Sequence, residues 1–278
     1  MPLGVIGARI GLLLMETNLS TCMELPAFGG DFDSFGGGIL SSLNSSGLSA
    51  SSLPCLSFFA SWGPLIGLLL LATVFVFLWL FFNRKVLNLP WWGALIASFA
   101  HTLIGVASVY AFACLENLIG GGSGRLSLYG GIFFMPLFYL CFACIRKIPF
   151  SASFDIFLPC LIGTLLFARV NCLFSGCCLG VPIEGSSIRV PTREMELVGN
   201  FTFLIIALAL NYQRKLTGRL YPLYMIGYGV LRFILEWFRE SDSPFPLHLG
   251  HIWSLVSIGV GAVFFIVLSI QKRKEKES

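Results

Sequence analysis

The chain consists of long apolar runs separated by short polar stretches. Strand-like alternation is absent, and several runs reach the roughly 20 residues that a helix needs to cross a bilayer. A helix is favoured there because it satisfies its backbone amides within one segment. We therefore predict an all-α polytopic membrane protein with about seven transmembrane helices. The predicted spans are 64–82, 89–115, 130–145, 152–173, 197–211, 219–238 and 249–270.

Composition supports the same fold class. Of the 278 residues, 56% are hydrophobic and 12% are charged, whereas a soluble domain is about a quarter charged. A large soluble core would also need charged helix faces, which these runs lack. The third and fifth spans are short, so they are expected to be tilted, broken or partly re-entrant.

Lysine and arginine are distributed unevenly between the two sets of connections, and this asymmetry predicts the orientation. One set holds most of the 18 basic residues. Its members are Arg84, Lys85, Arg146, Lys147, Arg214, Lys215, Arg219, Lys272, Arg273, Lys274 and Lys276. We expect this side to be cytoplasmic, with the C-terminus inside and the N-terminus outside. The net charge of +4 follows from this topology, and no nucleic-acid partner is expected.

Residues 1–58 are of a different kind, rich in glycine and serine and poor in aliphatic side chains. Such a composition cannot bury enough apolar surface to pack tightly. The predicted organisation is a loosely ordered outer segment over 1–58, a seven-helix transmembrane domain over 59–270 and a basic cytoplasmic tail over 271–278.

Cysteine and histidine suggest two further kinds of chemistry, and neither is favoured. The CxxC pair of Cys141 and Cys144 has the spacing of a thiol oxidoreductase, but it lies toward the predicted cytoplasmic, reducing side. The adjacent pair Cys177–Cys178 is suited to zinc if His248 and His251 join it. These two pairs come from separate loops, so no metal site is predicted.

Two arginines fall inside predicted spans, where a lone arginine costs about 3 kcal/mol on insertion scales. Arg169 is near the outer end of the fourth span, and Arg232 shares one face of the sixth with Glu236 and Arg239. An Arg232–Glu236 ion pair leaves Arg169 without a carboxylate, because Asp155 lies near the other end of its helix. The surplus positive charge predicts a bound anion, and a phospholipid phosphate suits arginine at that depth.

The connection before the third span, GGGSGRLSLYGG, is rich in glycine. Tyr129 is followed by Gly130 and Gly131, which allow the backbone to approach a ligand closely. This arrangement presents a phenol at the predicted outer interface. The alternative is an interfacial aromatic anchor, a common use of tyrosine.

The order of these motifs resembles the prolipoprotein diacylglyceryl transferase family. The motifs are YGG, ARVNCLFSGCCLG, VPTREMELVGN, YGVLRFILEWFRES and LHLGHIWS, and the resemblance covers about residues 60–270. It implies seven transmembrane helices in a bacterial-type cytoplasmic (plasma) membrane. It also implies transfer of a diacylglyceryl group from phosphatidylglycerol to the lipobox cysteine thiol in the signal-peptide region of a prolipoprotein, with release of glycerol phosphate. No cofactor is expected.

The resemblance assigns site residues position by position. Arg169 matches the signature arginine, Glu196 matches the glutamate of the loop motif, and Gly250 and Ser254 match the last motif. The expected catalytic residues are Tyr129, Arg169, Arg232 and Glu236. The expected substrate-binding residues are Gly130, Gly131, Ser175, Gly176, Gly180, Glu196, Arg239 and His251.

This sequence also departs from the family pattern. The usual HGG is YGG, so Tyr129 replaces the histidine often proposed as base. The signature's two asparagines become Cys172 and Ser175, and its glutamate becomes Cys177. Glutamine becomes Arg193 in the loop motif and His251 in the last one.

A general base must take the proton of the attacking thiol. Tyr129 can serve if the two arginines lower its pKa from about 10, and His251 is the alternative. Without a competent base, the chain is instead a non-catalytic or altered-specificity protein that retains an anionic-phospholipid pocket. A transporter is disfavoured, because the two halves show no self-similarity.

Overall fold

The computed structural model describes the chain from residue 54 onward, with gaps. The described ranges are 54–118, 127–174, 180–182, 189–213, 218–239 and 249–277. Side chains are described within these ranges except at 54–64, 118, 174 and 272–277. Most of the predicted N-terminal segment therefore lies outside the described residues.

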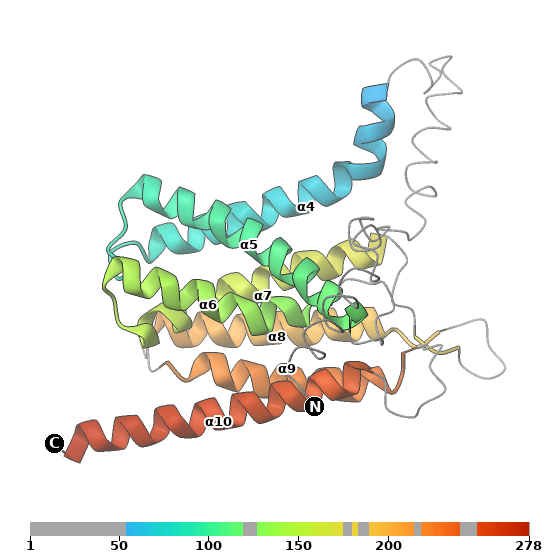
Figure 1. The fold of residues 1–278 in the computed structure, drawn as a ribbon. Helices are drawn as coiled ribbons and strands as arrows, with labels where there is room; N and C mark the ends of the chain where they lie inside the picture. Colours follow the sequence, from blue (N-terminus) through green and yellow to red (C-terminus); the bar gives the residue numbers. More distant parts are fainter. Residues whose placement is uncertain are drawn as a thin grey trace, which may run out of the picture.

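Seven helices account for nearly all of the described residues, which confirms the all-α fold class (Figure 1). They are α4 (Pro54–Phe82), α5 (Trp91–Leu118), α6 (Tyr129–Arg146), α7 (Phe150–Phe174), α8 (Thr192–Tyr212), α9 (Leu220–Glu236) and α10 (Leu249–Glu277). Six of them are long and apolar enough to cross a membrane. The other, α9, has 17 residues and lies along α10, its most extensive partner. The chain is a polytopic membrane protein.

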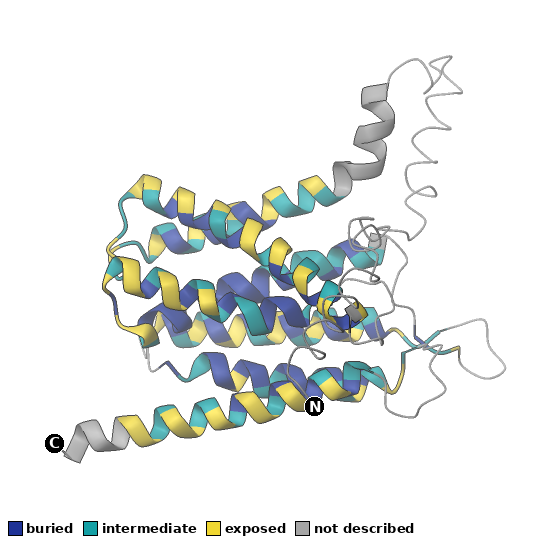
Figure 2. Ribbon diagram, viewed as in Figure 1, coloured by how far each residue is buried: buried dark blue, intermediate teal, exposed yellow. Residues whose placement is uncertain are grey.

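Helix α7 is the centre of the bundle, packed against α4, α6 and α8 (Figures 1 and 2). In its membrane span, 67% of the residues are buried, whereas 17% are buried in the span of α10, which lies at the edge of the bundle. On α7, Phe157 stacks on Tyr139 of α6, with ring centroids 4.9 Å apart. Because other helices surround α7, most of its polar side chains contact protein and not lipid.

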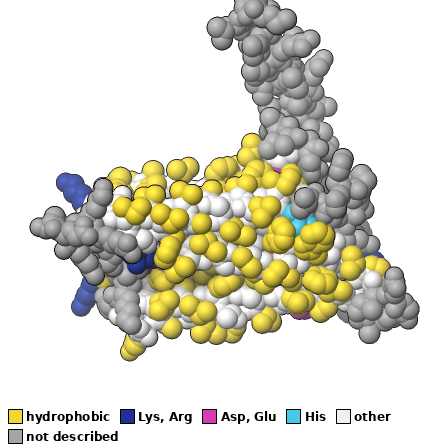
Figure 3. Space-filling model, turned by 90° about the horizontal axis from the view of Figure 1, so that it is seen from below, with side chains coloured by type: hydrophobic (Ala, Val, Ile, Leu, Met, Phe, Trp, Pro, Cys, Tyr) yellow, Lys and Arg dark blue, Asp and Glu magenta, His cyan; other side chains and the backbone are white. Residues whose placement is uncertain are grey.

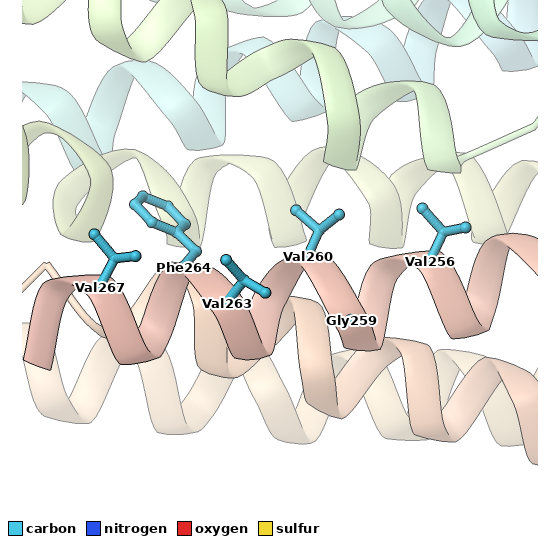
Figure 4. Close-up of a pocket in the computed structure, with 6 residues that line it drawn as sticks. All are labelled: Val256, Gly259, Val260, Val263, Phe264 and Val267. Carbon is cyan, nitrogen blue, oxygen red and sulfur yellow. The ribbon is translucent and has the colours of Figure 1, made fainter.

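The outer surface of the bundle is apolar, as expected for contact with lipid tails (Figure 3). Lysine and arginine side chains are seen mainly at one end of this view. In the sequence, Arg84 and Lys85 follow α4, Arg146 is the last residue of α6, and Lys147 comes directly after it. On α10, an apolar groove runs along the helix (Figure 4). It is lined by Val256, Gly259, Val260, Val263, Phe264 and Val267.

Near its start, α7 carries a buried carboxylate that binds the backbone at the start of α9. Asp155 accepts hydrogen bonds from the backbone N–H groups of Gly218 at 2.7 Å and Leu220 at 3.3 Å. Asn211 at the end of α8 donates to the Asp155 carbonyl at 2.9 Å. Gly218 has a φ of +73°, which favours glycine. A helix start leaves backbone donors without partners, so this carboxylate caps α9 from another helix.

The predicted spans match the observed helices in number and order, but two differences affect the site. Helix α8 begins at Thr192, five residues before the predicted 197. It directly follows Pro191, and the missing amide donor of proline costs no hydrogen bond at the start of a helix. Helix α5 continues to Leu118, beyond the predicted 115. Helices α6 and α8 are each continuous, so the short spans are not broken.

Candidate active site

The early start of α8 places Glu196 within the helix, buried and facing α7. Its Oε1 lies 2.8 Å from Nη2 of Arg169, and its Oε2 lies 3.2 Å from Nη1 of Arg232. The hydroxyl of Tyr228 also donates to Glu196 Oε1 at 3.0 Å. The expectation that Arg169 lacks a carboxylate is therefore wrong. The physical reason for this error is the position of the start of α8. Glu196 was expected in a loop, but it lies inside the helix, where its carboxylate pairs with Arg169.

The ion pairs continue along α9. Arg232 Nη2 lies 3.0 Å from Glu236 Oε2, and Arg239 Nη1 lies 3.4 Å from the same oxygen. The order of charges is Arg169, Glu196, Arg232, Glu236 and Arg239, and we call these five residues the charge ladder. Their side chains are between 3% and 14% exposed. Buried charges persist only when they are paired and hydrogen-bonded, and alternating signs provide that pairing.

The charge ladder contains three arginines and two carboxylates, so by itself it carries one surplus positive charge. Arginine remains ionised at any physiological pH and forms two parallel hydrogen bonds to a phosphate. A cluster of this sign and burial favours an anionic group. The predicted catalytic residues Arg169, Arg232 and Glu236 are thus brought together, along with Glu196 and Arg239.

Tyr129 opens α6 beside the charge ladder, but its hydroxyl points to a different partner. The oxygen lies 2.6 Å from Oγ of Ser254, which itself lies 2.7 Å from the carbonyl of Gly250. Because the serine has a single proton and gives it to that carbonyl, Tyr129 is the donor to Ser254. Its ring packs edge-on against Tyr228, with centroids 5.7 Å apart. These contacts make the tyrosine a link between α6 and α10.

The two glycines after Tyr129 have unequal surroundings. A Cβ on Gly130 would lie 2.7 Å from Cα of Val109 and 2.8 Å from Cβ of Phe112, so α5 and α6 touch at their backbones. A Cβ on Gly131 would meet Leu161 at 3.4 Å, close to ordinary contact. Of the two glycines, only Gly130 is required, because it allows the close approach of α5 and α6.

Residues 180–182, which come after α7 in the chain, contact the residues that follow α9. Gly180 forms a bridge with Arg239, and the N–H of Val181 donates to the carbonyl of Phe238 at 2.9 Å. A Cβ on Gly180 would meet the backbone of Val190, so three segments converge here. The predicted residue Gly180 is therefore joined to the end of the charge ladder. Ser175, Gly176 and the cysteine pair at 177–178 lie outside the described residues, as does His248.

Two residues in the first turn of α10 contact α9. His251 is fully buried, with its ring 4.8 Å from that of Trp237 and 5.2 Å from that of Phe233. A Cβ on Gly250 would lie 2.5 Å from Cδ of Glu236, so glycine leaves the space which this carboxylate occupies. The start of a helix favours a nearby anion. Glu236 therefore lies between two arginines and the start of α10.

A further acidic residue lies near the end of α5. Glu116 is buried, and Arg232 and Glu236 are close enough for their charges to act on it. The sequence-based prediction omitted this residue because the second span was ended at 115. A carboxylate directly after an apolar run was the signal available. Tyr228, which donates to Glu196, was also missed, since a tyrosine in an aromatic helix has no distinguishing pattern.

The chain matches the family model for prolipoprotein diacylglyceryl transferase over residues 57–267. It is similar to the phosphatidylglycerol–prolipoprotein diacylglyceryl transferases of three bacteria. Identity is 29% to that of Finegoldia magna, over 58% of this chain and 67% of the relative. It is 25% to that of Chlorobaculum tepidum, over 52% and 53%, and 28% to that of Pasteurella multocida, over 55% and 63%. The chain thus aligns with between about half and two thirds of the length of these relatives.

The matched region contains α5 to α9 entirely and most of α4 and α10, and it includes all five residues of the charge ladder. The buried ion pairs therefore lie within the part of the chain that matches the family. This chain belongs to the prolipoprotein diacylglyceryl transferase family.

Proposed function

We propose that the protein transfers a diacylglyceryl group from phosphatidylglycerol to the lipobox cysteine thiol of a prolipoprotein. The observation that carries this proposal is the charge ladder, whose buried arginines exceed its carboxylates by one. The family membership and the names of the relatives support the same substrates. The signal-peptide region of the prolipoprotein is the proposed acceptor segment.

In this proposal, Arg169 and Arg232 bind the phosphate of the lipid, and Glu196 holds their guanidinium groups apart at fixed positions. The thiol sulfur attacks the glycerol carbon that bears the phosphate ester, a C–S bond forms, and the C–O bond to phosphate breaks. The electron pair stays on the departing glycerol phosphate. Pre-positioned positive charge in a site poor in water stabilises that developing anion. Glu236 orients Arg232, and Arg239 contributes at the edge of the site.

We propose that the site faces the outer leaflet, with the C-terminus in the cytoplasm and the N-terminus outside. The charge ladder lies at the end of the bundle opposite the connections that contain Arg84–Lys85 and Arg146–Lys147. The excess of lysine and arginine marks the cytoplasmic side. Single cysteines in a cysteine-free background test this: an impermeant reagent added outside should label a cysteine at 186 and miss one at 83. The reversed pattern contradicts the outer-leaflet site.

The transfer reaction is tested by incubating the purified protein with phosphatidylglycerol and a lipobox peptide. Mass spectrometry should find the peptide heavier by one diacylglyceryl group, with glycerol phosphate released in equal amount. A peptide with serine in place of the lipobox cysteine is the control. If the cysteine peptide stays unmodified while the protein binds phosphatidylglycerol, the transferase proposal fails.

One observation supports a second candidate, a lipid-binding protein without transfer chemistry. Tyr129 occupies the position of the family's usual histidine, and its hydroxyl is hydrogen-bonded to Ser254. The charge ladder alone suffices to bind a phosphate. This candidate predicts selective binding of phosphatidylglycerol over phosphatidylcholine with no change in the mass of the peptide.

A further inference from the structure

Arg193 of α8 lies one helical turn from the charge ladder, on the side where α7 ends and α8 begins. Its Nη1 donates to the carbonyl of Cys172 on α7 at 3.4 Å. Cys172 comes one turn after Arg169 on α7, and Arg193 comes one turn before Glu196 on α8. This contact therefore lies about 5.4 Å, the pitch of a helix, beyond the Arg169–Glu196 ion pair.

The counter-ion of Arg193 is weakly held. Nη2 of Arg193 lies 3.5 Å from Oε1 of Glu194, whose side chain is 46% exposed. An exposed ion pair contributes little to stability, because water and salt screen it. The ion pair between Arg169 and Glu196, by contrast, is 2.8 Å long and almost fully buried. Arg193 can therefore exchange its carboxylate for an incoming anion at little cost.

The type of residue at this position favours phosphate as that anion. Every lysine of the chain belongs to the predicted cytoplasmic set, whereas the basic residues predicted for the outer side are all arginine. Both types supply positive charge, but arginine binds a phosphate through two parallel hydrogen bonds. The family pattern has glutamine where this chain has Arg193, so the additional cation distinguishes this chain from that pattern.

The reaction proposed above makes the phosphate more negative. In phosphatidylglycerol the phosphate is a diester with a single negative charge. Breaking the C–O bond releases glycerol phosphate, a monoester whose charge at pH 7 is between about −1.5 and −2. This product leaves towards water, and Arg193 is the next cation along α7 and α8 in that direction.

We propose that Arg193 and Arg169 form an exit site for the phosphate monoester product. Guanidinium groups on successive turns bind glycerol phosphate from two sides, and Glu194 releases Arg193 as the monoester arrives. The phosphodiester of the donor lipid is bound deeper, by Arg169 and Arg232, and does not need Arg193. This inference rests on the proposed transferase function.

The test compares two soluble ligands that differ in this charge: glycerol phosphate, a monoester, and glycerophosphoglycerol, a diester. Phosphorus NMR titration measures their binding to the purified protein in phosphatidylcholine nanodiscs. Wild type should bind the monoester more tightly than the diester. Arg193→Gln should weaken monoester binding about tenfold, the size of one charge-assisted hydrogen bond, and diester binding by less than about twofold. Glutamine is the residue of the family pattern at this position, so the change is compatible with the fold.

Two further variants sharpen the test. Glu194→Gln removes the competing carboxylate, so it should strengthen monoester binding about twofold, as expected for an exposed ion pair. Arg84→Gln is the matched control, the same change at the opposite end of the bundle, where Arg84 lies 4.6 Å from the centre of the Phe81 ring. It should leave both affinities unchanged.

The outcomes separate the exit site from the function itself. Equal losses for both ligands in Arg193→Gln contradict the exit site, because loss of the contact with Cys172 alone affects monoester and diester alike. Unchanged monoester binding in that variant also contradicts it, as does a wild type without preference for the monoester. Transfer to a lipobox peptide is measured on the same preparations. Active wild type with any of these results contradicts the exit site alone, whereas selective monoester binding without transfer contradicts the transferase proposal and supports the site.

Discussion

The two ends of α7 both bury charge, yet they are built differently. Near its start, Asp155 accepts hydrogen bonds from backbone N–H groups at the start of α9, and its geometry is set by the chain itself. Near its end, Arg169 pairs with the side chain of Glu196 on α8, which in turn pairs with Arg232 on α9. Backbone donors are fixed in place, whereas side-chain partners can be exchanged. The first arrangement suits a permanent structural contact, and the second suits a site that admits an external anion.

The largest expected effect is loss of activity on replacing arginine at the charge ladder. Arg169→Lys and Arg232→Lys should each lower transfer by about 100-fold or more, because lysine cannot bind a phosphate in a bidentate manner. Arg239→Lys is the matched control. Arg239 pairs at the longer distance of 3.4 Å, so the Arg239→Lys variant should retain most activity. Near-normal turnover in both inner variants would make these arginines purely structural.

Glu236→Gln should show a loss of stability that depends on the lipid. Without anionic lipid, the change weakens the neutralisation of Arg232 and Arg239, and breaking a buried pair costs several kcal/mol. With phosphatidylglycerol bound, the lipid phosphate supplies the counter-charge and stability should be nearly unchanged. Thermal unfolding in phosphatidylglycerol and phosphatidylcholine nanodiscs measures the difference. An equal loss in both lipids would contradict the phosphate site.

Asp155→Asn addresses the other end of α7. An asparagine places an NH2 group against one of the two backbone N–H groups, so the protein should lose about 2 kcal/mol of stability. This loss should be the same in both lipids, and activity per folded molecule should be unchanged. Glu236→Gln measured in parallel shows whether lipid dependence belongs to the charge ladder alone. A lipid-dependent loss at Asp155 would remove the contrast between the two ends.

The smallest expected effect is that of Gly250→Ala. Its methyl group would displace the Glu236 carboxylate without changing any charge. Turnover should fall about tenfold, equivalent to about 1.4 kcal/mol, with little change in unfolding temperature. Gly259→Ala on the same helix is the control, since its Cβ would meet nothing within 4 Å. Equal activities of the two variants would show that the position of Glu236 is unimportant.

The sequence predicted the helices well because their apolar runs must match the bilayer, and this constraint is strong and local. It also located the two inner arginines, since charge inside an apolar run is conspicuous. It did not predict the pairing of Arg169 with Glu196, which depends on where α8 begins. A span drawn from hydropathy starts where the apolar residues start, whereas α8 starts after Pro191, five residues earlier than the predicted 197.

Glu116 was missed for the same physical reason. The end of α5 passes beyond its apolar run, and only the packing of Phe112 on Trp253 shows which way that last turn faces. The hydrogen bond from Tyr129 to Ser254 was likewise unpredictable, because it joins residues on α6 and α10 that are far apart in sequence. Polar contacts between helices depend on rotation about each helix axis, which apolar composition does not specify.

The alternation of charge along α7, α8 and α9 also has a consequence for how the protein is made. Arg169 leaves the ribosome before Glu196, and Glu196 before Arg232, so each buried charge enters the membrane ahead of its next partner. Because an unpaired arginine costs about 3 kcal/mol in lipid on insertion scales, the arrival of α8 lowers the cost of holding α7 in the bilayer. The ion pair that shapes the site therefore also favours the association of these two helices in the membrane.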